Sequence, residues 1–339
     1  MPIKAKIDSI INSLGSISIQ DFVELSNFDE EGFYNSNEES KISTKGHFIT
    51  SPEITPLFGY SICNQFIREF HGKDVHLLEL GPGNGTLMSD IYYYLQSKNN
   101  NISQVSLLEK STYFREKLKK KLSFNINFLN NLSEINLKKN EVLFVYSNEF
   151  FDSISSKQYI FKNNKFYEIK ITKKNNTYEL VYEKSLLSDY LKNFYSEYIF
   201  EDNDILEHSN LLINYLEDLK SILKYNFFFS ATDYGYQKLP KKSTLRLVSN
   251  HKKIKLFDKF ENIDYSFGVN FNLIENTFKK FNPILISQKE LITKYLPNNF
   301  QKSSQKETNK AIEIISGKSF SDMGDSFNNI SFFYNEKNF

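Results

Sequence analysis

The stretch His76–Met88 reads HLLELGPGNGTLM and contains a glycine-rich turn between two regular elements. The apolar run Val75–Leu80 predicts a strand, and Thr86–Leu95 has the apolar spacing of a helix. A strand, a glycine turn and a helix in this order bring backbone N–H groups close to a nucleotide-like ligand. Glu79 stands just before the turn, and a carboxylate there suits a cationic or amine-bearing cofactor better than a pyrophosphate.

Three glycines, Gly81, Gly83 and Gly85, occupy the turn. The nicotinamide fingerprint G-x-G-x-x-G, counted from Gly81, requires its last glycine at the position of Thr86, whereas Gly85 comes one residue earlier. The spacing therefore favours another nucleotide-like ligand and leaves a dehydrogenase as the least favoured alternative.

Composition narrows the functional classes. The chain has 339 residues, and its 42 basic and 41 acidic residues leave a formal net charge of +1, which gives no reason to expect nucleic-acid binding. Cys63 is the only cysteine and the five histidines have no zinc-type spacing, so we expect neither a disulfide nor a metal. No apolar run is long enough for membrane insertion, and the N-terminus lacks the arginines of a transit peptide. A bacterial cytoplasmic location is predicted in preference to a mitochondrial matrix.

From Val75 onward, strand and helix patterns alternate. Further core strands are predicted at Val105–Leu108, Ile126–Leu129, Val142–Tyr146 and Phe227–Thr232, with a basic helix at Ser111–Leu122. Such alternation is typical of an α/β fold in which helices cover a parallel sheet.

Residues 157–183 break this alternation. Three β-segments separated by Asn163–Asn164 and Asn175–Asn176 predict a meander inserted after the fourth core strand. Two helical segments then follow, Leu186–Ile199 and Ser209–Leu223. The remaining core strands are predicted at Thr244–Ser249, Ile312–Ser316 and Ile330–Tyr334.

A second helix start precedes the glycine turn. Ser51 is predicted as its cap and Pro52 as its first residue, and the helix is expected to pass over Pro56 and end at Phe70. A helix start favours an anionic group such as a carboxylate near Thr50 and Ser51, although a plain cap is the alternative.

Polar residues follow three of the predicted strands. Glu109 ends the second strand, roughly where a doubly wound nucleotide site places its ribose-binding acid. Asn148, Glu149 and Asp152 follow the fourth strand in SNEFFDS, and Asp233 follows the fifth in ATDYGY. A carboxylate at this edge could grip a cation through charge-assisted hydrogen bonds, and a polar turn over core aromatics is the alternative.

Taken in order, six segments resemble the MidA-like family of S-adenosylmethionine-dependent methyltransferases, which includes the mitochondrial complex I assembly-factor methyltransferase. They are GHFITSPEITPLFG (46–59), LLELGPGNGTLMSD (77–90), LLEKS (107–111), SNEFFDS (147–153), TDYGY (232–236) and SDMGDSF (321–327). The resemblance extends from about Gly15 to Phe327. The family commonly has an aspartate at the position of His47, and a histidine and an aspartate where this chain offers Gly268 and Asn270.

The resemblance implies an α/β, class I (Rossmann-like) methyltransferase with a seven-strand, mostly parallel sheet, helices on both faces and inserted β-meander and helical elements. It implies an N-terminal helical segment and cofactor-contacting loop over 1–70, a methyltransferase core over 71–156 and 225–339, and a substrate-side insert over 157–224. The implied cofactor is S-adenosyl-L-methionine. The residues expected to hold it are Thr50, Ser51, Pro52, Glu53, Glu79, Gly81, Gly83, Gly85, Glu109, Asn131 and Leu132.

The resemblance also implies the acceptor, an arginine side chain of a respiratory complex I subunit, with symmetric dimethylation and support of complex I assembly. Glu149 is the first choice for gripping the guanidinium, with Asn148, Asp152 and Asp233 as further candidates. A carboxylate pair would localise the positive charge and free one nitrogen lone pair. A catalytically weak assembly chaperone and a small-molecule methyltransferase are the alternatives, and a homodimer is among the expected assemblies.

Overall fold

The computed structural model describes residues 1–36, 41–42, 49–138, 140–297 and 327–336. The chain forms two compact units. Unit 1 consists of Met1–Glu38, Asp152–Asn214 and Tyr236–Asn270, and unit 2 consists of Glu39–Phe151, Tyr215–Gly235 and Phe271–Phe339. The strand predicted at Ile312–Ser316, residues 46–48 of the first family segment and residues 321–326 of the last lie outside the described residues.

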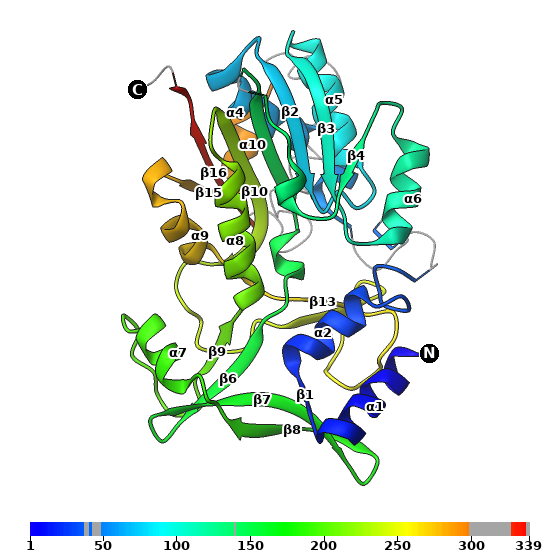
Figure 1. The fold of residues 1–339 in the computed structure, drawn as a ribbon, viewed down its shortest axis with the longest axis vertical. Coiled ribbons are helices and arrows are strands. Elements are labelled where there is room, and N and C mark those ends of the chain that lie inside the picture. Colours follow the sequence, from blue (N-terminus) through cyan, green and yellow to red (C-terminus); the bar gives the residue numbers. More distant parts are fainter. Residues whose placement is uncertain (37–40, 43–48, 139, 298–326, 337–339) are drawn as a thin grey trace. The chain divides into compact units, whose positions relative to one another are not determined.

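Unit 2 is built on a mostly parallel sheet (Figure 1). Among the described residues, seven strands follow one another in the order β15-β16-β10-β5-β2-β3-β4. The pairs within β10-β5-β2-β3-β4 are parallel, whereas β16 runs antiparallel to both β10 and β15. In chain order the strands are β2 (Asp74–Leu80), β3 (Asn101–Leu108), β4 (Asn127–Leu129), β5 (Val142–Asn148), β10 (Phe227–Tyr236), β15 (Ile284–Ser287) and β16 (Phe327–Tyr334). The predicted mostly parallel α/β sheet is therefore confirmed, and β15 is a strand that sequence reasoning missed.

Helices cover both faces of this sheet (Figure 1). They are α3 (Ser51–Ile54), α4 (Leu57–Phe70), α5 (Thr86–Ser97), α6 (Thr112–Lys121), α9 (Phe271–Thr277), α10 (Gln288–Tyr295), most of α8 (Asn210–Ile222), and the 3-10 helices η1 (Leu132–Glu134) and η3 (Lys279–Phe281). Successive side chains of a strand point to opposite faces, so the three phenylalanines that begin β10, Phe227–Phe229, can fill both. In β10, Phe228 lies edge-to-face with Phe66 of α4 at 5.7 Å between ring centroids, whereas Phe229 stacks on Phe278, the residue after α9, at 6.2 Å.

The helix predicted to cross Pro56 is instead two helices, so that prediction was wrong. Thr55 is extended (φ −161°, ψ 140°), and Pro56 forms the N-cap of α4. A residue before proline disfavours the helical region because the proline ring clashes with its backbone. The predicted cap, Ser51, is itself helical, and Thr50 is the N-cap of α3 without a side-chain capping bond.

Unit 1 contains the predicted meander. Its strands β6 (Lys157–Lys162), β7 (Lys165–Lys174) and β8 (Thr177–Lys184) pair antiparallel. The four turn asparagines all have positive φ, between 47° and 63°, which suits the tight turns that follow strand twist. The sheet is completed by β1 (Ile17–Ser18) and β9 (Ile205–His208), and the helices of unit 1 are α1 (Ile3–Leu14), α2 (Ile19–Phe28) and α7 (Ser188–Phe194).

The strand predicted at Thr244–Ser249 exists but does not belong to the core sheet. It forms β11 (Arg246–Ser249) and pairs with β12 (Lys252–Lys253) and β13 (Asp264–Ser266) in a three-stranded sheet of unit 1. Its Leu247 packs in an apolar cluster with residues of α1 and α2. Residues 1–38 and 236–270, which the sequence division placed outside the insert, thus group with the meander through this shared core.

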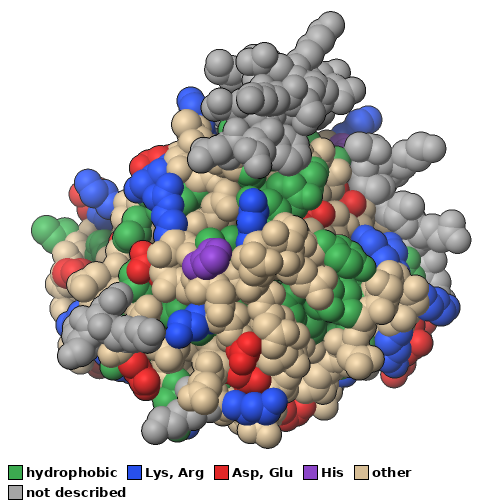
Figure 2. Space-filling model, turned by 90° about the horizontal axis from the view of Figure 1, so that it is seen from above, with side chains coloured by type: hydrophobic (Ala, Val, Ile, Leu, Met, Phe, Trp, Pro, Cys, Tyr) green, Lys and Arg blue, Asp and Glu red, His purple; other side chains and the backbone are tan. Residues whose placement is uncertain are grey.

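Surface charge is mixed. On the face of the molecule in Figure 2, basic and acidic side chains are interspersed among apolar and neutral surface. None of the helices in the described part of the chain has the length and apolarity that a membrane crossing requires.

Candidate functional site

The glycine turn after β2 has an unusual backbone. Gly81, Gly83 and Gly85 have φ of 63°, 49° and 71°, a region that other residues enter only at a cost. The Gly81 N–H donates to the Leu108 carbonyl at 2.9 Å, which ties the turn to the end of β3. A Cβ at Gly81 would lie 2.7 Å from Cδ2 of Phe150, so only glycine fits there.

Glu109 follows β3, and its side chain is directed to the glycine turn. Its Oε1 accepts the Ser111 N–H at 2.7 Å, and the backbone N–H groups of Gly83 and Lys110 also donate to the carboxylate. The residue is only 8% exposed, and burial, opposed by these three donors, raises the pKa of Glu109 to about 7. The acid and the turn therefore form one constellation, as the sequence led us to expect.

Glu79 is a buried carboxylate with an unfilled acceptor. Burial, together with the nearby Glu109 and Asp90 carboxylates, raises the pKa of Glu79 well above its usual value. The Met88 N–H donates to this carboxylate, but Oε2 has no hydrogen-bond partner among the described residues. A buried acceptor without a donor is rare in folded proteins, so Oε2 suits a ligand that brings an N–H group or a positive charge.

Two further carboxylates lie by the turn. Oε1 of Glu53 accepts the Thr86 hydroxyl at 2.7 Å and the Asn84 amide at 3.2 Å, which joins α3 to the start of α5. Sequence reasoning missed Asp90, whose Oδ2 is buried without a partner in the described ranges; burial, with Glu53 nearby, raises its pKa to about 7. The sequence signal that could have identified Asp90 was its position one helical turn after Thr86.

No group of three or more His, Cys, Asp or Glu in the described residues is placed to hold a metal ion.

Ile42 approaches the same turn, and the neighbouring Lys41 lies against α6. The Asn84 amide donates to the Ile42 carbonyl at 2.8 Å, and Cδ1 of Ile42 lies 3.0 Å from where a Cβ on Gly83 would stand. The buried Lys41 ammonium lies 4.4 Å from the centroid of the Tyr113 ring. A ligand that reaches Gly83 from this side therefore meets the Ile42 side chain.

The far border of the site is held by Arg115, which sequence reasoning also missed. Its Nε donates to the Glu109 carbonyl at 2.6 Å and its Nη2 to the Leu129 carbonyl at 2.7 Å, so the ends of β3 and β4 are joined. As the one arginine in a lysine-rich helix it had a visible signal. After β4, Asn131 is exposed and Leu132 is buried in η1.

The helix start at Thr50 and Ser51, which was predicted to favour an anionic group, makes contacts within the protein. Ser51 is fully buried, and its hydroxyl accepts the Gln288 amide of α10 at 2.9 Å. Thr50 and Pro52 are also buried, and α3 is only one turn long. The segment therefore adds a rigid wall beside the turn through Glu53 and α10.

At the same edge of the sheet, β5 ends in a corner at Asn148 and Glu149. The Glu149 N–H donates to the Thr232 carbonyl at 2.9 Å, and its φ of 51° is strained for a residue with a side chain. Its Oε1 accepts the Asn148 amide at 3.1 Å, and Oδ1 of Asn148 is buried with no partner in the described part of the chain. The Asn148 amide and the Glu149 carboxylate thus lie together, and Oδ1 of Asn148 is able to accept a further hydrogen bond.

The other two candidates differ in place. Asp233 lies at the end of β10 in unit 2, is 1% exposed, and accepts the N–H groups of Phe151 and Tyr234, each at 2.9 Å. Asp152 is the first residue of its segment of unit 1, where its carbonyl accepts the Phe267 N–H at 2.8 Å. The structure therefore brings Asn148, Glu149 and Asp233 together with the cofactor candidates in unit 2.

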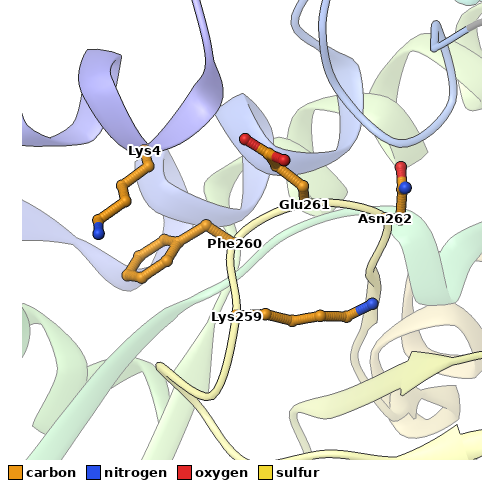
Figure 3. A pocket seen from close by; sticks show the side chains of 5 residues that line it. All are labelled: Lys4, Lys259, Phe260, Glu261 and Asn262. Carbon is orange, nitrogen blue, oxygen red and sulfur yellow. The ribbon is translucent and has the colours of Figure 1, made fainter.

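A cavity of about 370 Å³ lies in unit 1 (Figure 3). Lys4, Lys259, Phe260, Glu261 and Asn262 line it, and the Lys4 ammonium is 5.8 Å from the centroid of the Phe260 ring. None of these residues belongs to the predicted site.

Comparison with known proteins shows the family to which the chain is similar. Residues 61–284, more than half of the chain, match the profile of a family described as putative S-adenosyl-L-methionine-dependent methyltransferase. The protein arginine methyltransferase NDUFAF7 homolog of Caenorhabditis elegans is 25% identical over 283 residues, 73% of this chain and 65% of the nematode protein. Human protein arginine methyltransferase NDUFAF7 is 40% identical over 86 residues, 24% of this chain and 19% of the human protein. The chain thus spans less than two thirds of either relative.

Solved structures support the fold. A COG1565 superfamily member from Burkholderia thailandensis, solved with S-adenosyl-homocysteine, has a TM-score of 0.80 at 16% identity and covers 98% of this chain and 92% of its own. A native COG1565 protein from the same organism has a TM-score of 0.76 at 16% identity, with 98% and 91% covered. At this identity the likeness shows the fold, and it confirms the class I prediction.

We expect Gly81→Ala to lower the free energy of unfolding by about 2–3 kcal/mol, because it adds left-handed strain and a clash with Phe150. Gly72→Ala is the matched control, since Gly72 has φ of 67° but nothing within 4 Å of its Cβ position. Urea unfolding of both variants separates the clash from the strain. Equal losses would contradict the close packing of Phe150 on the turn.

The Asp90 carboxyl should make stability depend on pH. Between the usual pKa of 3.8 and the folded value of about 7, the folded state holds a proton that the unfolded state has lost, so stability falls as pH rises across this window. We expect Asp90→Asn to be more stable than wild type at pH 8 by about 1–2 kcal/mol, after allowance for partial solvent screening, and equal to it near pH 4. Thermal unfolding at both pH values measures this, and a pH-independent difference would refute it.

Proposed function

Because this chain belongs to the family of putative S-adenosyl-L-methionine-dependent methyltransferases, we propose that it methylates an arginine side chain of a respiratory complex I subunit and supports assembly of that complex. The observation that carries the donor half is the constellation of the glycine turn, the Glu109 carboxylate and the unpartnered Glu79 Oε2. The acceptor half rests on the corner at Glu149 and on the names of the curated relatives.

The donor site is fitted to a cationic amino acid joined to a nucleoside. Gly81, Gly83 and Gly85 give the turn the left-handed backbone that brings it beside Glu109, Glu79 would accept the ammonium, and Glu109 would accept the ribose hydroxyls. The cofactor supplies a methyl group already activated by a sulfonium, so the protein has chiefly to orient the reactants and exclude water.

The rest of the donor site would frame the ligand. Thr50, Ser51, Pro52 and Glu53 would form the wall beside the glycine turn, and Asn131 and Leu132 would border the adenine. Their proposed roles depend on the fixed ends of β3 and β4, which Arg115 joins.

The acceptor site is fitted to a guanidinium. This group stays protonated in proteins and is a poor nucleophile, so a carboxylate must hold it and draw its positive charge away from the reacting nitrogen. Glu149 would make this contact, and the buried Asn148 Oδ1 would accept a second N–H from the same group. Asp152, three residues beyond Glu149, is the further carboxylate candidate.

A homodimer and a bacterial cytoplasmic location stay predictions. The symmetry of dimethylation is also part of the proposal, and mass spectrometry of the modified arginine would read it directly.

Binding of S-adenosylhomocysteine tests the donor half. The charged form of Glu109 accepts hydroxyl donors better, so affinity should rise as pH increases from 5.5 to 8, about tenfold if binding lowers the pKa by one unit. Glu109→Gln should bind more weakly and lose part of this slope, the remainder being due to Glu79 and Asp90. Calorimetry measures both. Glu141→Gln, a buried carboxylate just before β5, is the control, and wild-type binding by Glu109→Gln would refute the ribose contact.

Glu149→Gln tests the acceptor half. Removing the charge while keeping the shape should lower methyl transfer about 100-fold, with affinity for S-adenosylhomocysteine unchanged. The assay follows tritium from S-adenosylmethionine into protein extract of cells that lack this chain, and mass spectrometry identifies the methylated residue. Undiminished transfer would contradict the role of Glu149. Lost transfer with normal complex I assembly in cells would favour the chaperone alternative, and methyl groups only on small molecules would refute protein methylation.

A further inference from the structure

We propose that Asp233 is the positioning residue of the acceptor site, and that its buried carboxylate fixes the corner from which Glu149 is presented. This inference rests on the proposed role of Glu149, and it assigns Asp233 a task other than gripping the substrate.

The corner is anchored to β10 at two points. β5 and β10 are parallel, with Asn148 opposite Thr232, and β5 ends at this pair. The Glu149 N–H donates to the Thr232 carbonyl at 2.9 Å. Two residues later the Phe151 N–H donates to Oδ2 of Asp233, also at 2.9 Å. The backbone from Glu149 to Phe151 is thus hydrogen-bonded at both of its ends to the end of β10.

The second anchor is a charge-assisted bond in a buried place. Asp233 is 1% exposed, and its Oδ1 accepts the Tyr234 N–H at 2.9 Å. A buried carboxylate is stable only where donors surround it, and each oxygen of Asp233 accepts a backbone N–H. Glu149 is partly exposed, which makes it the better group to touch an acceptor.

The strain at Glu149 explains why two anchors are needed. Its φ of 51° lies in the left-handed region, which a glutamate leaves unless its surroundings hold it there. Loss of the Phe151 anchor would let the backbone relax and point the Glu149 carboxylate elsewhere. A displacement of about 1 Å at a reacting group can cost about 100-fold in rate.

Packing keeps the rest of the corner in place. The Phe150 ring lies against Gly81 and at 5.2 Å from the Tyr215 ring centroid. A change at Asp233 should therefore alter the direction of Glu149 and leave the fold and the donor site intact.

The test is Asp233→Asn, which keeps the shape but removes the charge and turns one amide N–H toward a backbone donor. We expect single-turnover methyl transfer, with saturating S-adenosylmethionine and the extract described above, to fall 10- to 100-fold. The dissociation constant of S-adenosylhomocysteine should stay within about threefold of wild type. Asp233→Glu serves as a second variant if Asp233→Asn is unstable, and Glu141→Gln controls for the loss of any buried carboxylate.

The double variant with Glu149→Gln separates positioning from direct contact. If Asp233 acts through Glu149, the loss caused by Asp233→Asn should disappear when Glu149 is already glutamine. A crystal structure of Asp233→Asn should show the Glu149 carboxylate redirected while the Phe150 ring still lies against Gly81. An undiminished loss in the Glu149→Gln background, or an unmoved Glu149 carboxylate in a variant with lost activity, overturns the positioning role.

Failure of the proposed function has a different signature. Wild-type transfer by Glu149→Gln would refute the role of Glu149, and with it this inference. A loss on Glu149→Gln combined with normal activity of Asp233→Asn refutes the positioning role alone.

Discussion

The candidate site depends on a junction of hydrogen bonds that joins the glycine turn to the end of β3, at Leu108 and Glu109. The Gly81 N–H donates to the Leu108 carbonyl, and the Gly83 N–H donates to the Glu109 carboxylate. These hydrogen bonds hold the ends of β2 and β3 together. Arg115 extends the junction to β4. Because the strands are parallel, every one of these ends lies at the same edge of the sheet, and that edge therefore collects the polar groups of the candidate site.

Burial disfavours the charged form of three carboxylates at this edge. Glu79, Asp90 and Glu109 are buried or nearly so, and burial raises the pKa of each. The backbone N–H groups around Glu109 offset part of the cost, whereas Oε2 of Glu79 and Oδ2 of Asp90 have no such compensation among the described residues. A ligand that carries positive charge would supply the missing partner, and such perturbed groups are typical of functional sites.

Predictions from sequence succeeded where local pattern and chemistry agree. The glycine turn, the strand and the helix that flank it, and the asparagine turns of the meander are each set by a few neighbouring residues, and all were confirmed. The helix over Pro56 was wrong because a proline overrides the apolar spacing that suggested continuity. The strand near Thr244 was assigned to the wrong sheet because spacing identifies a strand but not its partner.

By itself the sequence determined the local features of the candidate site: a glycine turn preceded by Glu79, an acid at Glu109 directly after a strand, and polar residues at Asn148 and Glu149 after another. These are local signals, and the residues that carry them are close in the chain. Tertiary structure alone decided which acids share an edge, that Asp90 and Arg115 belong to it, and that Asp233 is bonded to the backbone of Phe151, 82 positions away. Hydrogen bonds between strand ends depend on sheet order and register, which no local pattern specifies.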